Sequence, residues 1–277
     1  IMHSNGGFDV IIGNPPYVEV NENLPYSLDK LITSKCGNLY GNCIERGFTL
    51  KTKGYFGFII PVAITCSKRM QKVIDFFNKK SSITYFANFD DRPGKLFEMI
   101  QHLRATIFIA KTTPRTNSNE KFFSTKYNRW YSECRASLFN NIVYQDVYNI
   151  VKEYIVPKIS YDVEASIYDK INKSKGRLGL TFANSYTPDS AYYRAAGGGY
   201  FNLIKIKESE TIINGIKEKV KAEKRICIKE EYSNVSIGSI MSSTLFYWLY
   251  IASTDCRNLQ KKFIDNFPCN IDELKKD

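Results

Sequence analysis

Short apolar runs alternate with amphipathic stretches over the first 113 residues of the chain. Residues 8–13 are mostly apolar and end in turn-forming residues, which is typical of a strand buried on both faces. Between residues 67 and 79, Met70, Val73, Ile74 and Phe77 recur at helical spacing and form one apolar stripe. The same reasoning predicts a helix over residues 38–51 and strands over residues 55–61, 83–89 and 103–111.

Strands that are separated by helices of this length need crossover connections. The predicted fold class is therefore α/β, with a partial Rossmann-like sheet that is mostly parallel. Residues 90–101 join the last two predicted strands without an obvious helix. We therefore expect these two strands to pair antiparallel, which places an antiparallel strand at an edge of the sheet.

A polar stretch at residues 112–121 ends this alternation. It predicts a boundary between a domain of residues 1–113 and a second region of residues 114–277. The second region is expected to be α+β, with a helix over residues 162–173 and β-hairpin features around residues 197–199. A further helix through residues 245–249 would be capped by Ser242 or Ser243, and another would run from Asp255 to Phe263.

Charge narrows the classes of partner. The 277 residues carry a net charge of +11 and have a sequence pI near 9.2. The excess is spread over both halves, with 14 basic against 9 acidic residues up to position 113 and 25 against 19 beyond it. Such a balance favours a polyanion such as double-stranded DNA, because each phosphate contact releases condensed counterions.

Cysteine and histidine usage argues against a disulfide framework and a metal site. The seven cysteines are scattered, odd in number and without a Cys-x-x-Cys pair, and only two histidines exist. We therefore expect reduced thiols, a cytoplasmic location and no metal. The most apolar stretches are far shorter than the roughly 20 residues that span a bilayer, so no membrane association is expected.

The most informative motif is Asn14-Pro15-Pro16-Tyr17, which directly follows the predicted strand of residues 8–13. Methylating an exocyclic amine is difficult because the nitrogen lone pair is delocalised into the ring. The Asn14 side-chain carbonyl and the Pro15 main-chain carbonyl can accept hydrogen bonds from such an amine. Two prolines hold both acceptors in place at little entropic cost, and the Tyr17 ring can stack on the target base.

The position of this motif also suits a substrate site. In an open α/β sheet, ligands bind beyond the carboxyl ends of the strands, which is where this loop lies. A base in duplex DNA would have to be flipped out to reach it. The alternative interpretation is a simple turn after a strand, since Asn-Pro and Pro-Pro commonly form loops.

Residues 8–113 resemble the second half of the amino-group DNA methyltransferases, especially the adenine-N6 enzymes of bacterial restriction–modification systems with an Asn-Pro-Pro-Tyr motif. The matching stretches are residues 8–17, 39–46, 54–61, 89–97 and 104–109. The resemblance implies that Asn14, Pro15, Pro16 and Tyr17 are catalytic and that S-adenosylmethionine is the methyl donor. Residues 242–268 resemble the C-terminal part of these proteins, which would make residues 114–277 a target-recognition region.

The donor-binding half that this family uses is not recognisable. We find no Phe-x-Gly-x-Gly turn after a strand, and residues 197–199 (Gly-Gly-Gly) lack a preceding buried strand. The donor half would then lie upstream of Ile1 or beyond Asp277, and the start at Ile1 favours the first. We expect this chain alone to bind S-adenosylmethionine poorly, to show little or no turnover, and to work with the missing half or with other restriction–modification subunits.

Several basic and aromatic residues are candidates for DNA contact besides Tyr17. Arg92, Lys95, His102 and Arg104 cluster around the loop between the last two strands of the first domain. Tyr193 and Arg194 lie near the glycine run of the second region, and aromatic and arginine side chains suit contact with bases. Each set could equally be solvated surface or core, and the charge run at residues 217–225 is better explained as a solvated face.

Three functions remain open. The first is transfer of a methyl group to adenine N6 in DNA, with Asn14 favouring adenine because cytosine-N4 enzymes usually begin this motif with Ser. The second is a DNA-binding or specificity remnant without catalysis. The third is a protein-glutamine methyltransferase, which uses the same tetrapeptide but would not need some 160 further residues or a charge of +11.

Overall fold

The computed structural model describes residues 7–21, 24–50, 54–100, 102–112, 121–196, 204–220 and 222–276. The glycine run at residues 197–199 therefore lies outside the described part. The chain divides into two compact units, with residues 1–165 and 252–255 in unit 1 and residues 166–251 and 256–277 in unit 2.

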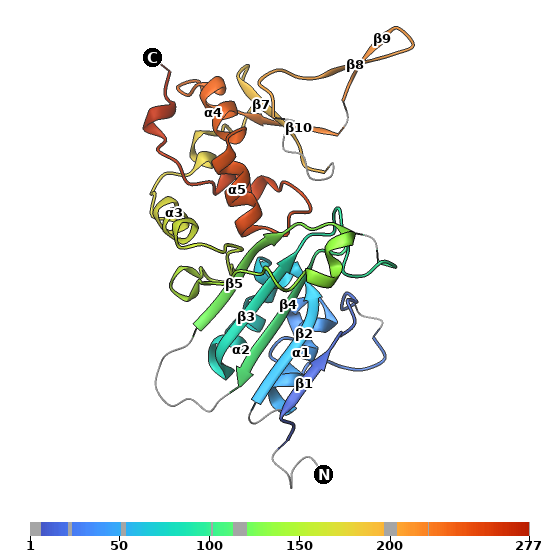
Figure 1. Cartoon of the computed structure of the whole chain (residues 1–277). Helices are drawn as coiled ribbons and strands as arrows, with labels where there is room; N and C mark the ends of the chain where they lie inside the picture. Colours follow the sequence, from blue (N-terminus) through green and yellow to red (C-terminus); the bar gives the residue numbers. More distant parts are fainter. Residues whose placement is uncertain are drawn as a thin grey trace. The chain divides into compact units, whose positions relative to one another are not determined.

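Unit 1 is built on a six-stranded mixed sheet with the order β1-β2-β4-β3-β5-β6. Four strands, β1, β2, β3 and β5, run in one direction, and β4 and β6 run in the other (Figure 1). The strands are β1 (Val10–Gly13), β2 (Gly54–Pro61), β3 (Ser81–Phe89), β4 (Ala105–Thr112), β5 (Lys121–Asn128) and β6 (Gln145–Asp146). The carboxyl ends of β1, β2, β3 and β5 consequently meet at the same edge of the sheet.

The strand expected at the sheet edge lies inside the sheet instead. β3 and β4 pair antiparallel as predicted, with Phe86 opposite Phe108. However, β4 inserts between β2 and β3, so it is hydrogen-bonded on both sides. The loop of residues 90–104 gives the chain enough length to turn back into this gap, and the buried Phe108 fills it.

Two helices, α1 (Leu39–Leu50) and α2 (Gln71–Lys80), pack together on one face of the sheet (Figure 1). Both begin within a few residues of the predicted positions. Buried phenylalanine rings fill the layer between them and the sheet in edge-to-face pairs, which are worth about 0.5–1.5 kcal/mol each beyond burial. These rings belong to Phe48, Phe56, Phe77, Phe86 and Phe108. A Cβ on Gly47 would lie 2.3 Å from the Phe56 ring, so only glycine allows α1 this close to β2.

β1 is not buried on both faces, contrary to its predicted character. Among the described residues it pairs only with β2, and its Val10 and Ile12 side chains are 60% and 85% exposed. The register places both on the sheet face opposite α1 and α2, together with Tyr55 and Ile109, which are about half exposed. Apolar residues therefore line an open face beside an edge strand.

The sheet of unit 1 continues beyond the boundary predicted at residue 113. β5 pairs in parallel with β3, and β6 then pairs with β5, so residues 121–146 belong to the same sheet. The division between the two units falls near residue 165, within α3 (Asp162–Asn172). The sequence offered no signal for this, because the polar stretch that suggested a boundary is only a connection between strands.

Unit 2 combines helices with antiparallel strands, as expected of an α+β region. The strands are β7 (Ser190–Arg194), β8 (Glu210–Ile213), β9 (Ile216–Lys219) and β10 (Glu223–Cys227), and the helices are α4 (Asn234–Met241), α5 (Thr244–Ser253) and α6 (Lys261–Asp265). β7 pairs with β10, and β8 forms a hairpin with β9. The predicted cap of α5 is confirmed by the Phe246 amide, which donates to Ser243 Oγ at 3.1 Å.

The helix predicted from Asp255 to Phe263 is wrong. The only helix in that stretch is α6, which begins at Lys261. Cys256 adopts a left-handed backbone conformation, with φ of 56°, which stops a helix from continuing past Asp255. In the described part of the chain, no single helix has the length and apolarity to cross a membrane, although α4 and α5 together pass that test across a 53° bend.

Candidate functional site

The Asn14–Tyr17 loop leaves β1 at the carboxyl edge of the sheet and is anchored on both sides. Directly after it, the Leu39 amide donates to Val18 O at 2.9 Å and the Val20 amide donates to Gly37 O. These bonds tie the loop to the start of α1. On the other side, the Tyr17 hydroxyl lies 2.8 Å from the main-chain oxygen of Ile59 in β2. The loop is therefore held between a strand and a helix terminus.

Within the loop, the Tyr17 hydroxyl also contacts Asn14 Oδ1. A hydroxyl has one hydrogen, so Ile59 O and Asn14 Oδ1 are alternative acceptors for it. Asn14 and Pro16 are exposed, Pro15 is buried, and Tyr17 is half-buried. The structure therefore brings the two side chains of the motif together and leaves the Asn14 amide accessible from solvent.

The Tyr17 ring packs edge-to-face on Tyr40 of α1, with ring centroids 6.4 Å apart. Burial raises the pKa of Tyr17 to about 12, so the hydroxyl stays protonated and remains a donor at every physiological pH. Burial also raises the pKa of Tyr40, far beyond its ordinary value. Both rings are thus neutral groups whose position is fixed by packing.

A buried polar cluster on α1 supports the segment that anchors the motif loop. Glu45 accepts hydrogen bonds from the Thr33 amide (2.8 Å), the Thr33 hydroxyl (2.7 Å) and the Ile32 amide (3.1 Å). Asn42 donates to Thr33 O at 2.9 Å. Thr33, Asn42 and Glu45 are each at most 5% exposed. Sequence reasoning gave Glu45 no role, although a Glu inside an otherwise apolar helix face was a visible signal.

The carboxyl end of β3 carries a second cluster, made of acidic residues and arginines. Asp91 is 1% exposed and faces Arg104 Nη2 at 3.4 Å and His102 Nδ1 at 3.6 Å. Asp90 lies 3.3 Å from Arg129 Nε and accepts a hydrogen bond from the Tyr127 hydroxyl at 2.9 Å. Sequence reasoning assigned no role to Asp90 and Asp91. Two carboxylates directly after a buried strand were the signal that could have found them.

The predicted basic residues of this loop differ in their surroundings. The Arg104 side chain is only 13% exposed and is paired with Asp90 and Asp91, an arrangement that suits holding the loop. Arg92 is exposed, and its Nη2 lies 3.4 Å from His102 Nδ1. Lys95 is half-buried, and its main-chain oxygen accepts a hydrogen bond of 2.6 Å from Arg135. Arg92 therefore has the more accessible side chain.

The motif loop after β1 and the acidic cluster after β3 lie at the same edge of the sheet, but they follow strands that are not neighbours. β1 and β3 are separated by β2 and β4. Three strand spacings of about 4.8 Å place the ends of β1 and β3 roughly 14 Å apart. The structure thus brings Arg92, His102 and Arg104 together with each other around Asp91.

The two candidates in unit 2 lie side by side on β7 and have opposite exposure. Tyr193 is 2% exposed, which leaves its ring no surface for a base in this arrangement. Arg194 is exposed. The strand register places Arg225 of β10 opposite Tyr192, and its side chain is exposed as well. Sequence reasoning treated Arg225 as the end of a solvated charge run.

Neither a metal site nor a donor site can be assigned. Among the described residues, no group of three or more His, Cys, Asp or Glu side chains is placed to hold a metal ion. The described part also contains no strand that ends in a glycine-rich turn at the carboxyl edge. All seven cysteines are free thiols.

Comparison with protein-family models gives one match that covers the motif. Residues 1–97 match the model of the Eco57I restriction-modification methylases, which is about a third of the chain. The matched segment includes β1, the Asn14–Tyr17 loop, α1, β2, α2 and β3. No curated protein sequence matches the chain.

Solved structures with a similar chain trace include parts of much larger enzymes. The Type ISP restriction-modification enzyme LlaBIII bound to DNA shares 14% identity at a TM-score of 0.42, over 70% of this chain and 15% of that one. A nuclease-deletion mutant of the Type ISP enzyme LlaGI with a DNA substrate mimic gives 17% and 0.41, over 68% and 18%. A Listeria monocytogenes protein assigned to the class I S-adenosylmethionine-dependent methyltransferases gives 18% and 0.29, over 40% and 34%. At these scores the likeness supports no functional inference.

Proposed function

We propose that this chain supplies the acceptor side of an S-adenosylmethionine-dependent DNA methyltransferase that modifies adenine N6 within a restriction–modification system. The observation that carries the proposal is the Asn14–Tyr17 loop at the carboxyl end of β1, anchored to β2 and α1. The family match over residues 1–97 supports methylase chemistry for this segment. The net charge of +11 supports a nucleic-acid substrate.

The residues of the loop can prepare an exocyclic amine for attack. Asn14 Oδ1 accepts a hydrogen bond from the amine, which draws the nitrogen toward tetrahedral geometry and directs its lone pair outward. Tyr17 can transfer its own hydrogen bond to Ile59 O, 2.8 Å away, and so release Asn14 for the substrate. The cofactor would supply a methyl group on a sulfonium centre. A preorganised acceptor of this kind costs no reorganisation at the moment of reaction.

The adenine assignment depends on the first residue of the motif. Asn14 provides a carbonyl acceptor, whereas cytosine-N4 enzymes usually carry Ser at this position. For a duplex substrate the base must be flipped out of the stack, and the exposed Asn14 marks where it would arrive. Arg92 and Lys95, on the same edge of the sheet, are proposed to contact phosphates there.

The donor-binding side is proposed to come from another segment or subunit that adds to β1. Edge strands with free hydrogen-bonding groups are templates for pairing with a further strand. The apolar side chains of Val10, Ile12, Tyr55 and Ile109 beside that edge form a surface that such a segment could cover. Within this proposal, unit 2 contributes target recognition, and the isolated chain shows little or no turnover.

A second candidate function is DNA binding without methyl transfer. The observation that favours it is the lack of a glycine-rich donor turn among the described residues. Both candidates bind DNA, so binding alone does not separate them. Transfer of a labelled methyl group does.

The test uses the chain within its native reading frame, with labelled S-adenosylmethionine and duplex DNA. Digestion of the DNA to nucleosides then locates the label. We expect N6-methyladenine, and we expect Asn14→Ala to lower the rate by about 100-fold or more, the usual effect of removing one preorganised hydrogen-bond partner. Asn140→Ala, an exposed asparagine outside the motif, is the matched control and should leave the rate unchanged.

Each other distribution of label has a defined meaning. Label on cytosine would overturn the adenine assignment and keep the chemistry. Label on protein only would favour the protein-glutamine alternative. Salt-sensitive DNA binding with no transfer of label would favour the second candidate.

A further inference from the structure

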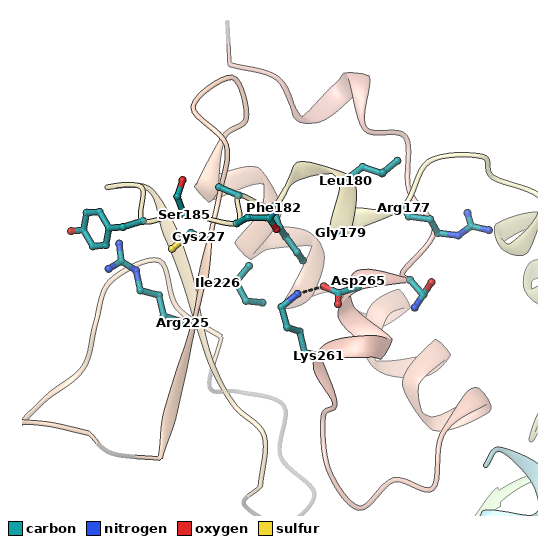
Figure 2. Close-up of a pocket in the computed structure, with 14 residues that line it drawn as sticks. Arg177, Gly179, Leu180, Phe182, Ser185, Arg225, Ile226, Cys227, Lys261 and Asp265 are labelled. Atoms are coloured by element: carbon teal, nitrogen blue, oxygen red, sulfur yellow. Dashed lines mark hydrogen bonds and ion pairs between the residues drawn. The ribbon is translucent and has the colours of Figure 1, made fainter. Parts of the chain in front are cut away.

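Unit 2 contains an open pocket of about 770 Å³ that none of the proposed chemistry uses. Phe182, Leu180 and Ile226 contribute apolar surface to it, and Asn184 and Ser185 add neutral polar groups. Figure 2 shows Arg225 and Arg177 toward the two ends of this lining, with the Lys261–Asp265 ion pair between them. Lys261 Nζ and Asp265 Oδ1 are 2.5 Å apart, so their charges cancel. The net positive charge of the lining therefore comes from the two arginines.

Arg225 is held in place by neutral acceptors. Its Nε donates to Ser190 Oγ at 2.7 Å, and its Nη2 donates to the main-chain oxygen of Thr187 at 2.5 Å. The guanidinium carbon lies 4.1 Å from the Tyr186 ring centroid and 5.9 Å from that of Tyr192. Stacking of a guanidinium on tyrosine and two hydrogen bonds along one side fix its orientation.

The hydrogen bonds that hold Arg225 leave part of its recognition surface available. They use Nε and one hydrogen of Nη2, along the side of the guanidinium. Neither bond uses Nη1, so the end formed by Nη1 and Nη2 can still donate two parallel hydrogen bonds. Among the residues that the structure describes, no carboxylate is paired with Arg225, and the side chain is exposed at the pocket. Its full positive charge is therefore available as well.

An arginine that presents two parallel donors is the commonest specific reader of guanine, whose O6 and N7 both accept in the major groove. Prior fixing of the side chain reduces the rotamer entropy that recognition costs. Tyr186, 75% exposed beside the guanidinium, and the amide of Asn184 are placed to contact a neighbouring base or sugar.

We infer that Arg225, held by Ser190 and Thr187 and stacked on Tyr186, reads a guanine in the DNA sequence that unit 2 recognises. The inference rests on the proposed function, because it takes DNA as the ligand, and it names the residue and base through which one position is specified. It also shifts base recognition from the buried Tyr193 to the opposite strand of the same β-ribbon.

The experiment selects duplexes that bind the chain from a random pool and then measures affinity by fluorescence anisotropy. We expect at least one selected position to be guanine. Replacing that guanine by 7-deazaguanine removes the N7 acceptor and leaves every phosphate in place. The wild-type affinity should then fall by about 5-fold or somewhat more, the lower part of the range for a bidentate base contact, because O6 still accepts one hydrogen bond. Arg225→Lys should bind both duplexes equally.

Lys224→Ala is the matched control, because it removes one exposed charge from the adjacent position, on the other face of β10. It should weaken binding to all duplexes alike and keep the preference for guanine over 7-deazaguanine. Ser190→Ala provides a second variant that retains Arg225 but removes the acceptor for Nε. It should reduce the same preference without abolishing binding. Circular dichroism melting of each variant establishes that unit 2 is folded.

Two results would overturn the inference: no sequence preference in the selected pool, or a preference for guanine over 7-deazaguanine that Arg225→Lys retains. If Arg225→Lys retains that preference but binds all duplexes more weakly, the result would identify a phosphate contact. The readout requires no methyl transfer. Failure of the proposed enzymatic function would therefore leave a positive result for Arg225 intact, and methyl transfer without a guanine preference would count against Arg225 alone.

Discussion

Two arginines, one in each unit, have surroundings opposite to those that the sequence suggested. Arg104 was expected to contact DNA because it lies near the catalytic edge, and Arg225 was expected to be solvated because it ends a charge run. In the structure Arg104 is 13% exposed between Asp90 and Asp91, whereas Arg225 is exposed and held by a hydroxyl and a carbonyl. The difference lies in their partners.

The comparison teaches that a carboxylate partner and a neutral acceptor have opposite consequences for an arginine. Two carboxylates neutralise the guanidinium, so we expect the loss of either side of this pairing to lower the free energy of unfolding. Neutral acceptors fix the guanidinium equally well but leave its charge for a ligand. We therefore expect the cluster after β3 to stabilise the fold and the Arg225 site to recognise a ligand. This contrast can be tested from both sides.

The largest expected effect is on stability in unit 1. Asp91→Ala removes a carboxylate that is 1% exposed and leaves Arg104 nearly buried with one opposing charge fewer. Breaking a buried pair from one side costs about 3–5 kcal/mol. We expect the lower end, about 3 kcal/mol, because Asp91 accepts no hydrogen bond among the described residues and Asp90 remains nearby. Urea unfolding followed by circular dichroism measures it.

Glu98→Ala is the control for that experiment. Glu98 is in the same loop as Asp91, and its Oε1 lies 4.0 Å from Arg135 Nη2. The side chains of Glu98 and Arg135 are 87% and 47% exposed. Exposed pairs contribute about 0–1 kcal/mol, so this variant should unfold almost as the wild type does. Equal unfolding free energies for Asp91→Ala and Glu98→Ala would contradict the interpretation that Asp91 and Arg104 stabilise unit 1.

A smaller effect is expected from Asp90, and it depends on pH. Burial raises the pKa of Asp90 above its ordinary value, more than the hydrogen bond from Tyr127 lowers it. A raised folded-state pKa means that the folded protein takes up this proton first as pH falls. The folded state is therefore penalised by the charge at neutral pH, and the penalty disappears as pH falls through the folded-state pKa.

Asp90→Asn removes that charge while its Oδ1 can still accept from Tyr127. The variant should be at least as stable as the wild type at pH 7, and any advantage should shrink on acidification. Unfolding free energies at pH 7, 5 and 4 measure the trend. A variant that is less stable than the wild type at pH 7, with a deficit that shrinks on acidification, would show that the pairing with Arg129 and Arg104 dominates over burial.

The sequence predicted helices and strands better than it predicted the burial and the partners of individual side chains. β1, β2, α1, α2 and the cap of α5 could be placed because periodicity and capping are local properties of the chain. The insertion of β4 between β2 and β3 could not, since it depends on which strands pair across long separations. The same holds for the burial of Tyr193 and for the carboxylates around Arg104, because their partners lie on other strands.

The Asn14–Tyr17 loop was placed at the correct end of β1 from sequence, but the hydrogen bond within it was not foreseen. Tyr17 was expected to act through its ring alone. Its hydroxyl contacts Asn14, and this contact is possible only because the loop turns back on itself between β2 and α1. The tetrapeptide predicts the chemistry that we propose, and the fold adds a neutral partner for the Asn14 amide.

Tyr17 is a second case of a polar group held by neutral acceptors, and it should give the smallest effect. Tyr17→Phe keeps the ring against Tyr40 and removes the hydroxyl that competes for Asn14 Oδ1. Because the substrate amine would displace that hydroxyl in any case, we expect methyl transfer to change by less than about 3-fold, under 1 kcal/mol. Transfer of label to DNA by the chain in its native reading frame measures this.

The alkaline titration of the same variant locates the group directly. Absorbance at the phenolate band should include a tyrosine that titrates near pH 12 in the wild type and is missing in Tyr17→Phe, because burial keeps this hydroxyl protonated beyond the ordinary value of 10. A rate loss as large as that of Asn14→Ala would contradict the interpretation. Such a loss would mean that the Tyr17 hydroxyl takes part in catalysis. Neutral hydrogen-bond acceptors around a polar group would then no longer indicate that the group is available to bind a ligand.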